Sequence, residues 1–312
     1  MDSRQALLAH LAALTLTMEF LGTLPQVLFS GLAAGSVYAL VALAMVIIYR
    51  TTEVLNFAQG DMAMMSTYVG LAFLVAGGMP FFWAMLGALA FAAALGAFSE
   101  FAFLRRAKEP TVLGLIIITL GLEMIVFGFA SWKWGGDPRD LPTPLSPTDV
   151  VVLGGVIMSY LELATIGIAA ATISALFLFL NRSKAGLAMR ATQQNRAVAR
   201  LMGIRVRRVE MGAWALAAVI GGIAGLLVGP AATVEPYMMW DPMMKGFAAA
   251  VLGGMTSLAG AALGGAIIGI IENLFGFYVS TAFKSVVPFA AILLMLAIKP
   301  SGLLARHYVK KV

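Results

Sequence analysis

Polar side chains that could contact a small solute lie in two short stretches of this largely apolar sequence. The first is Asn56-Phe57-Ala58-Gln59-Gly60-Asp61, and the second is Gly253-Gly254-Met255-Thr256-Ser257. Their amides and hydroxyls can donate and accept hydrogen bonds without carrying charge. The alternative for each of these polar residues is a helix cap or a hydrogen bond between helices. The candidate solute-contacting residues are Asn56, Phe57, Gln59, Gly60, Gly253, Gly254, Thr256 and Ser257.

A third stretch is rich in arginine and has the spacing of a helix. Eight basic residues and no acidic residue lie in the segment 182–208. Within it, 187–202 is predicted to form a helix that Gly203 is well placed to end. Val198, Leu201 and Met202 share one face of this helix, while Arg196 and Arg200 share another. It could lie on anionic lipid headgroups, be a simple basic loop, or dock into a groove of a partner protein.

The composition excludes several classes of protein. Of 312 residues, 61% are hydrophobic and only 12% are charged, and the mean hydropathy is +0.94. A soluble domain is closer to one quarter charged, so a soluble enzyme, a disordered chain and a disulfide scaffold are excluded. Cysteine is absent and the two histidines, His10 and His307, lie near opposite ends. Thiolate chemistry and a histidine metal cluster are therefore not expected.

The remaining class is an all-α, polytopic transmembrane bundle of about eight to ten spans. A transmembrane β-barrel is not expected, because its strands alternate apolar and polar residues, whereas these runs are continuously apolar. Ten apolar segments are predicted at 6–22, 27–49, 56–76, 81–104, 111–131, 159–180, 209–229, 243–257, 260–278 and 283–298.

The connections between segments differ in charge. Basic residues gather after 81–104 (Arg105, Arg106, Lys108), in 182–208 and in the tail 299–312, whereas acidic residues predominate in 132–149 and 230–242. Lys and Arg accumulate in cytoplasmic loops, so the basic connections are predicted to be cytoplasmic and the acidic ones external. The net charge of +6 is explained in this way without invoking nucleic acid.

The number of crossings then places the chain ends. If 6–22 spans the membrane separately from 27–49, both termini are cytoplasmic. The first segment also resembles a signal sequence, because Arg4 precedes a short apolar run. No clear small-x-small cleavage site follows it, which favours a retained helix.

Ten segments divide into two halves of five, and an odd number makes the halves inverted relative to each other. The third segment of each half looks interrupted by the polar or Gly-rich stretches named above. Paired broken segments are the best sequence pointer to a transport pathway at the membrane midplane. The alternative is a Gly-rich packing face and an ordinary loop. We predict one transmembrane domain over 1–312: a first half 1–131, an external connection 132–158, a second half 159–298 and a cytoplasmic tail 299–312.

Small residues recur every four positions in several segments. Gly31 and Gly35 form one such stripe, and Gly265 and Gly269 belong to another. Small stripes allow helix backbones to approach closely in lipid. They predict a tight helical bundle and do not indicate a substrate.

Charged residues inside predicted spans require partners or water. Glu123 and Glu272 are expected to face the protein interior or water, because a carboxylate at the bilayer centre costs roughly 2.5–3.5 kcal/mol. Glu100 is expected to pair with Arg105, and Lys245 to extend outward toward the membrane surface.

Five motifs in order resemble those of the branched-chain (hydrophobic) amino-acid ABC importer permeases. The basic segment contains Gly186-Leu-Ala-Met-Arg-Ala-Thr-Gln-Gln-Asn-Arg-Ala-Val-Ala-Arg-Leu-Met-Gly-Ile204, which is similar to the coupling segment of the family. The others are Gly31–Leu40, Leu55–Asp61, Phe247–Gly265 and Lys299-Pro-Ser-Gly-Leu-Leu304. The sequence departs from the family pattern in two places. An extra apolar run precedes Leu24, and Gln59 stands where many relatives have His.

The resemblance implies a permease subunit that is not itself an enzyme. No phosphate-binding Gly-x-x-x-x-Gly-Lys-Ser/Thr motif is present, so ATP and Mg²⁺ would be bound by two cytoplasmic ABC ATPase subunits. The other implied partners are a second homologous permease chain, a periplasmic substrate-binding protein and the lipid bilayer of a bacterial inner membrane. The coupling residues that the resemblance implies are Arg190, Asn195, Arg196, Ala197, Arg200, Leu201 and Gly203.

The substrate class implied is a branched-chain or other hydrophobic amino acid. Neutral polar groups beside small and apolar residues suit a zwitterion with an apolar side chain that is passed along rather than held tightly. Within the same family, urea, short amides and other amino acids remain alternatives. In a different class, an ion-coupled secondary transporter would also have inverted repeats and broken helices, but no paired acidic cluster for a coupling ion is evident.

Overall fold

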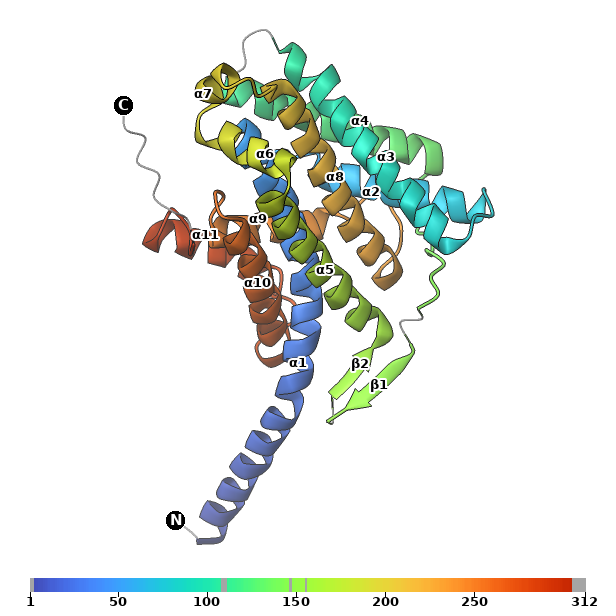
Figure 1. The fold of residues 1–312 in the computed structure, drawn as a ribbon. Coiled ribbons are helices and arrows are strands. Elements are labelled where there is room, and N and C mark those ends of the chain that lie inside the picture. The colour runs from blue at the N-terminus through green and yellow to red at the C-terminus, as the bar shows by residue number, and fades with distance from the viewer. Residues whose placement is uncertain (1–2, 108–110, 146–147, 155, 305–312) are drawn as a thin grey trace.

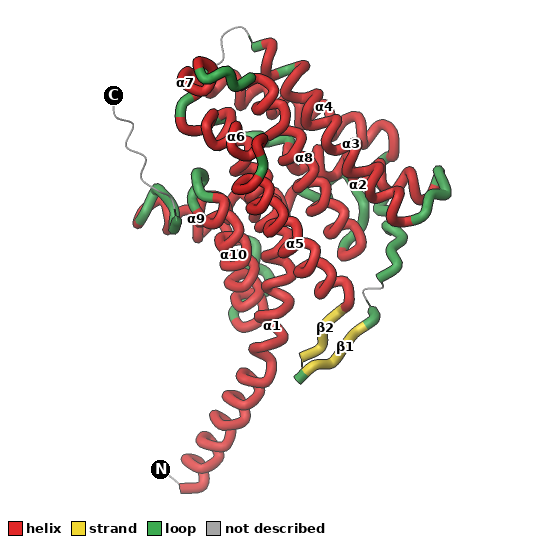
Figure 2. The backbone as a smooth tube through the Cα atoms, in the orientation of Figure 1, coloured by secondary structure: helices red, strands yellow, loops and turns green. Residues whose placement is uncertain are grey.

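The structure, a computed structural model, is a bundle of helices with one small hairpin of strands (Figure 1). It describes residues 3–107, 111–145, 148–154 and 156–304. The helices are α1 (Ser3–Thr52), α2 (Gln59–Val75), α3 (Phe81–Ala102), α4 (Val112–Trp134), α5 (Tyr160–Arg182), α6 (Lys184–Gln194), α7 (Arg196–Leu201), α8 (Val206–Ala231), α9 (Trp240–Gly253), α10 (Leu258–Tyr278) and α11 (Val286–Ile298). Strands β1 (Val150–Leu153) and β2 (Val156–Ser159) pair antiparallel, and Figure 2 separates them from the helices.

The first two predicted segments are one helix, which corrects the prediction of two. α1 continues through Pro25, because neighbouring groups in a membrane helix can satisfy the backbone carbonyl that a proline leaves free. The condition of the parity argument, a separate crossing by 6–22, is therefore not met, and the cytoplasmic N-terminus stays a prediction. The other predicted segments each correspond to a helix, so nine helices replace ten segments. The basic residues Lys108, Arg306, Lys310 and Lys311 lie outside the described residues.

Six of the described helices are long and apolar enough to cross a membrane, including Gly22–Thr52 of α1. The third segment of each predicted half is shorter. α2 has 17 residues and α9 has 14, and each adjoins a non-helical stretch. In the described part of the chain, the multi-pass membrane fold therefore combines six long spans with shorter helices, which include α2, α9 and the 13-residue α11.

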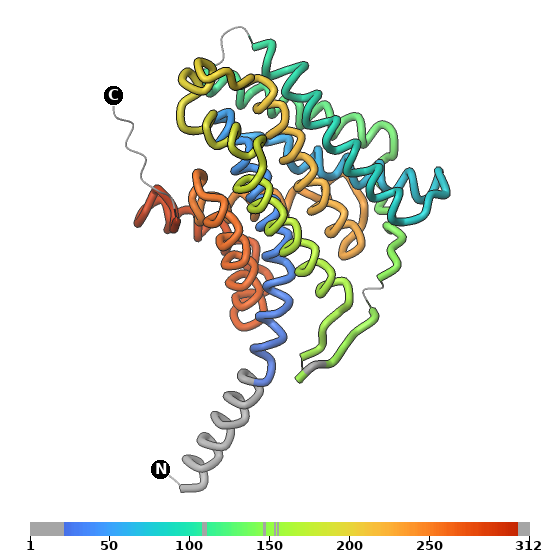
Figure 3. Tube along the Cα trace, in the orientation of Figure 1, coloured from blue at the N-terminus to red at the C-terminus, as the bar shows by residue number. Residues whose placement is uncertain are grey.

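The long helices divide into central and peripheral ones. The apolar window of α1 is 89% buried, whereas those of α3, α4 and α5 are 22% buried or less. α2 is also central, with residues from Gln59 to Leu71 mostly buried. A helix that is apolar all round and exposed suits contact with lipid tails. Figure 3 shows the blue α1 running between the orange α9 and α10 on one side and the green and gold α5 and α8 on the other.

The small-residue stripes bring α1 and α10 into backbone contact, as predicted. A Cβ atom at Gly35 would lie 2.7 Å from the Gly265 carbonyl oxygen, and one at Gly31 would lie 2.9 Å from the Ile270 Cα. Only glycine leaves space for this antiparallel packing.

Contacts join two of the three predicted basic connections to each other, and the two acidic connections to each other. At one end, Arg105 donates to the Arg207 carbonyl at 3.2 Å, which joins two basic connections. Toward the other, Arg139 and Val234 exchange backbone hydrogen bonds of 3.1 and 2.8 Å, which joins the two acidic connections. The β1–β2 hairpin and α7 lie at opposite ends of the bundle (Figure 1).

Candidate functional site

The predicted helix 187–202 is two helices, α6 and α7, with a break at Asn195. Asn195 is extended (φ −159°, ψ 109°), and its side chain accepts hydrogen bonds from Ala197 N and Val198 N at 2.9 and 3.0 Å. An asparagine in this conformation is a strong N-cap. The single-helix prediction is therefore wrong, because the amide of Asn195 stabilises a new helix start.

α7 presents an apolar face outward at the basic end of the molecule. The exposed fractions are 51% for Val198, 86% for Leu201 and 78% for Met202. Ala197, Arg200 and Gly203 are also exposed, and Gly203 reverses the chain at φ 82°. We call the surface formed by 196–203 the coupling surface.

Arg196 connects this surface to the bundle. Its guanidinium donates to the carbonyl oxygen of Thr51 at the end of α1 and lies 3.6 Å from Glu210 of α8. On α6, Arg190 lies 3.4 Å from Asn181 Oδ1 at the end of α5. The two short helices are therefore tied by arginines to three long ones.

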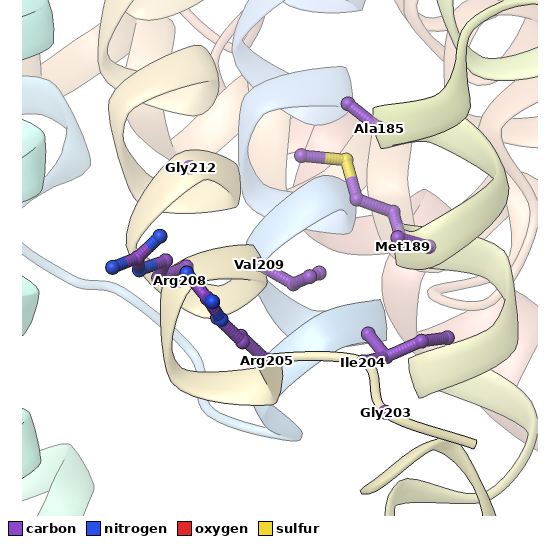
Figure 4. Close-up of a pocket in the computed structure, with 9 residues that line it drawn as sticks. Ala185, Met189, Gly203, Ile204, Arg205, Arg208, Val209 and Gly212 are labelled. Carbon is purple, nitrogen blue, oxygen red and sulfur yellow. The ribbon is translucent and has the colours of Figure 1, made fainter.

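A shallow pocket adjoins the coupling surface. It has a volume of about 460 Å³ and lies between α6 and the first turns of α8. Figure 4 shows Met189 and Val209 on its apolar side and Arg205 and Arg208 at its rim. Apolar walls with basic groups at the rim suit a protein segment bearing apolar and acidic side chains.

The segment 53–58 between α1 and α2 is non-helical yet holds buried polar groups. Asn56 and Gln59 are at most 1% exposed. Asn56 Nδ2 donates to Gln59 Oε1 at 3.2 Å, and Gln59 Nε2 donates to the Ala217 carbonyl of α8 at 3.1 Å. This chain of amides links the non-helical segment to α8.

Other contacts fix the same segment from α4 and α9. Thr119 Oγ1 donates to the Leu55 carbonyl at 3.1 Å and lies 3.4 Å from the Phe57 amide nitrogen. A Cβ at Gly60 would lie 3.2 Å from the Met243 side chain. Within the described part of the chain, the buried Oδ1 atoms of Asn56 and Asp61 have no hydrogen-bond partner. Both are acceptors in the region predicted to contact solute, and that role stays a prediction.

Replacing Gly221 by alanine is expected to disrupt this amide chain. A Cβ atom there would overlap with Gln59 Nε2, so the bond to Ala217 cannot form and a buried amide loses its partner. Such a loss costs about 1–3 kcal/mol. Thermal unfolding of the purified variant in detergent should show a lower midpoint. Gly167→Ala is the control, since no described atom lies within 4 Å of the added Cβ, and an equal midpoint for both variants would contradict the account.

The predicted Gly-rich stretch of the second half forms the end of α9. Gly254 is at φ 103°, and a Cβ at Gly253 would overlap with the backbone of Gly260. The carbonyls of Leu252 and Gly253 accept from the amides of Leu303 and Leu304, at 2.9 and 3.1 Å. The Lys-Pro-Ser-Gly-Leu-Leu motif therefore caps α9, a role not predicted from the sequence.

The remaining two pathway candidates lie at the start of α10. Ser257 is the N-cap of α10, with its hydroxyl accepting from Gly260 N at 3.0 Å. Thr256 is exposed. Among the described residues, the stretch 253–257 shares no hydrogen bond with Asn56 or Gln59, so the two polar stretches form separate regions. Solute contact at either region stays a prediction.

Three charged residues inside spans have definite partners. Glu100 pairs with Arg105 at 2.8 Å, as predicted. Lys245 does not extend outward: it is 6% exposed, and its Nζ lies 2.7 Å from Glu272 Oε1. The prediction for Lys245 is wrong because Glu272, on the neighbouring α10, compensates its charge in the interior. Because the two residues lie 27 positions apart on different helices, no local sequence pattern predicts that they pair.

Comparison with known proteins places these features in context. The family described as "Branched-chain amino acid transport system / permease component" matches residues 27–296. The high-affinity branched-chain amino acid transport system permease protein LivH of Escherichia coli (strain K12) is 32% identical, over 94% of this chain and 99% of LivH. BraD of Pseudomonas aeruginosa, with the same description, is 30% identical, over 92% and 97%. A solved structure, PsaBC from Streptococcus pneumoniae in complex with Fab, shares the fold alone, with TM-score 0.50 and 16% identity over 91% of this chain and 97% of that one.

Proposed function

The chain belongs to the family of branched-chain amino acid transport system permease components, and from this premise we propose that it moves branched-chain or other hydrophobic amino acids inward as the transmembrane subunit of an ABC importer. The observation that carries the proposal is the similarity to LivH along 94% of the chain. The coupling surface at the basic end supports it independently.

We assign the energy source to partner subunits. In the proposed assembly, two cytoplasmic ATPases bind ATP and Mg²⁺, a second homologous permease completes the pathway, and a periplasmic binding protein delivers the substrate. The membrane is the bacterial inner membrane, with the basic end facing the cytoplasm.

The coupling surface has the chemistry of a helix that docks into a groove. Val198, Leu201 and Met202 supply apolar contacts, and the surrounding arginines supply charge complementarity to an acidic rim. Because the apolar face is short, the proposed occupant of the groove is one helix turn rather than a broad interface. Lipid headgroups are the competing contact for the same face.

Arg196 connects the coupling surface to α1 and α8, and motion of α7 would reach those helices through it. A displacement of α7 would pull on the Thr51 carbonyl at the end of α1, directly before the buried segment of Asn56 and Gln59. The same guanidinium pairs with α8 through Glu210. Closure of the ATPases would thus move the ends of α1 and α8 together, and with them the amide chain between Gln59 and Ala217.

The test is uptake by a complete complex in proteoliposomes. The chain is reconstituted with its partner permease, ATPases and binding protein, and radiolabelled leucine is supplied outside. We expect uptake that requires internal ATP and does not respond to collapse of proton and sodium gradients. Uptake that follows an ion gradient without ATP would contradict the proposal, and uptake of urea or short amides without leucine would correct its substrate.

A further inference from the structure

One carboxylate at mid-membrane depth is exposed rather than buried. Lys245 Nζ lies 5.4 Å from the centre of the Tyr38 ring, and Tyr38 is near the middle of the apolar stretch Gly22–Thr52. Asp241 was predicted to belong to the external connection 230–242, but it lies on α9 one turn before Lys245, and its side chain is 61% exposed. Its depth is therefore close to the centre of the bilayer.

Lys245 holds this carboxylate and a second one behind it. Its Nζ lies 2.6 Å from Asp241 Oδ2 and 2.7 Å from Glu272 Oε1. Glu272 is 1% exposed and also lies 3.6 Å from Lys284 Nζ. The Lys245–Glu272 pair therefore joins α9 to α10 in the interior, whereas Asp241 is the member of the cluster that faces outward.

An exposed carboxylate cannot face lipid tails without cost. Insertion scales give about 2.5–3.5 kcal/mol for a charge at the bilayer centre. The face of α9 that bears Asp241 must therefore meet water or another protein in the assembly.

Aromatic side chains adjoin Asp241 on the same face. Tyr237 and Trp240 are about half exposed, and their rings lie 4.9 Å apart at an interplanar angle of 85°. Phe127 of α4 contacts both, at 5.0 and 6.1 Å, and Met244 is exposed one turn along. A carboxylate beside an aromatic and thioether surface matches a ligand with an ammonium group and an apolar side chain.

We infer that Tyr237, Trp240, Asp241 and Met244 line the translocation pathway, and that the Asp241–Lys245 pair exchanges partners with the zwitterionic head of the passing amino acid. The inference rests on the proposed function and names the substrate-contacting residues within it. Asp241 takes the ammonium group and Lys245 the carboxylate, so two ion pairs replace one and no charge is left bare. The rings and Met244 contact the apolar side chain.

The exchange explains how a pathway can favour zwitterions without trapping them. When the substrate leaves, Asp241 and Lys245 pair again, which returns most of the interaction energy. Glu272 keeps Lys245 in place throughout, so Lys245 positions Asp241 as well as contacting the substrate.

Asp241→Asn in the complete reconstituted complex separates this role from a structural one. It leaves the Lys245–Glu272 pair intact, so the variant should assemble with unchanged subunit stoichiometry and unchanged ATP hydrolysis. Leucine uptake at saturating binding protein should fall at least 10-fold, and the ATP hydrolysed per leucine should rise accordingly. Asp241→Glu should recover at least one third of the uptake.

Asp149→Asn is the matched control, because this carboxylate is exposed on the connection before β1, and its uptake should match that of the unaltered chain. Normal uptake by Asp241→Asn would overturn the inference. Loss of the second permease from that variant complex would also overturn it, in favour of a subunit contact. Failure of the unaltered complex to move leucine would instead overturn the proposed function.

Discussion

Replacing Gly265 by leucine is expected to prevent the assembly of a folded bundle. At this position a Cβ alone would overlap with the backbone of Ala39 on α1, and leucine adds three more carbons. Lateral displacement of α10 would also separate Gly269 from Gly31 and Gly35. Overpacking typically costs about 1–3 kcal/mol, and here it separates the touching backbones of α1 and α10, so we expect the upper end of that range or more.

The measurement is the fraction of detergent-extracted protein that elutes as a single species, together with its thermal midpoint. Gly128→Leu on α4 is the control, because no described atom lies within 4 Å of its added Cβ. We expect the control to behave as the unaltered chain. A normal elution profile and midpoint for Gly265→Leu would show that α1 and α10 do not pack in this way.

Replacing Leu201 by glutamate is expected to weaken binding of the ATPase subunits at least 30-fold. Leu201 is the most exposed apolar side chain of the coupling surface, at 86%. Burying a carboxylate in an apolar groove leaves it unpaired, and truncation of an interface hot spot alone costs about 2 kcal/mol or more. Ala197→Glu should act in the same direction, because Ala197 is exposed one turn before Leu201 on the same face of α7.

Affinity is measured with purified permease complex and ATPase in detergent at fixed salt. Val152→Glu on the hairpin is the control, since Val152 is 64% exposed but lies at the other end of the bundle. Its affinity should be unchanged. Normal ATPase affinity and normal uptake for both coupling-surface variants would refute docking at this surface.

Much of the fold follows from patterns within single segments. Apolar runs and small-residue stripes act locally, so they predict the spans and the close packing of helices, but not that α1 pairs with α10. The merged α1 was missed because Gly22 and Pro25 look like a break, whereas a membrane helix retains its other hydrogen bonds. The split at Asn195 was missed because the apolar spacing continues across it, and only the conformation of the asparagine ends α6.

The candidate sites depend more on contacts between distant residues. The pairing of Lys245 with Glu272, the amide chain from Asn56 to Ala217 and the capping of α9 by Leu303 and Leu304 all join separate helices. No local spacing encodes such contacts. Asp241 is a further case. Its charge is evident in the sequence, but its depth in the membrane follows only from the contact of its partner Lys245 with Tyr38 on α1.

The location and occupancy of the coupling surface are most directly tested by thiol labelling. The chain has no cysteine, so Met202→Cys gives a single reporter on the coupling surface, and Val152→Cys gives one on the hairpin. With a membrane-impermeant reagent, we predict that position 152 is labelled in intact cells. Position 202 should be labelled only in inverted vesicles stripped of ATPase, and added ATPase should protect it. Labelling of position 202 in intact cells would contradict the account.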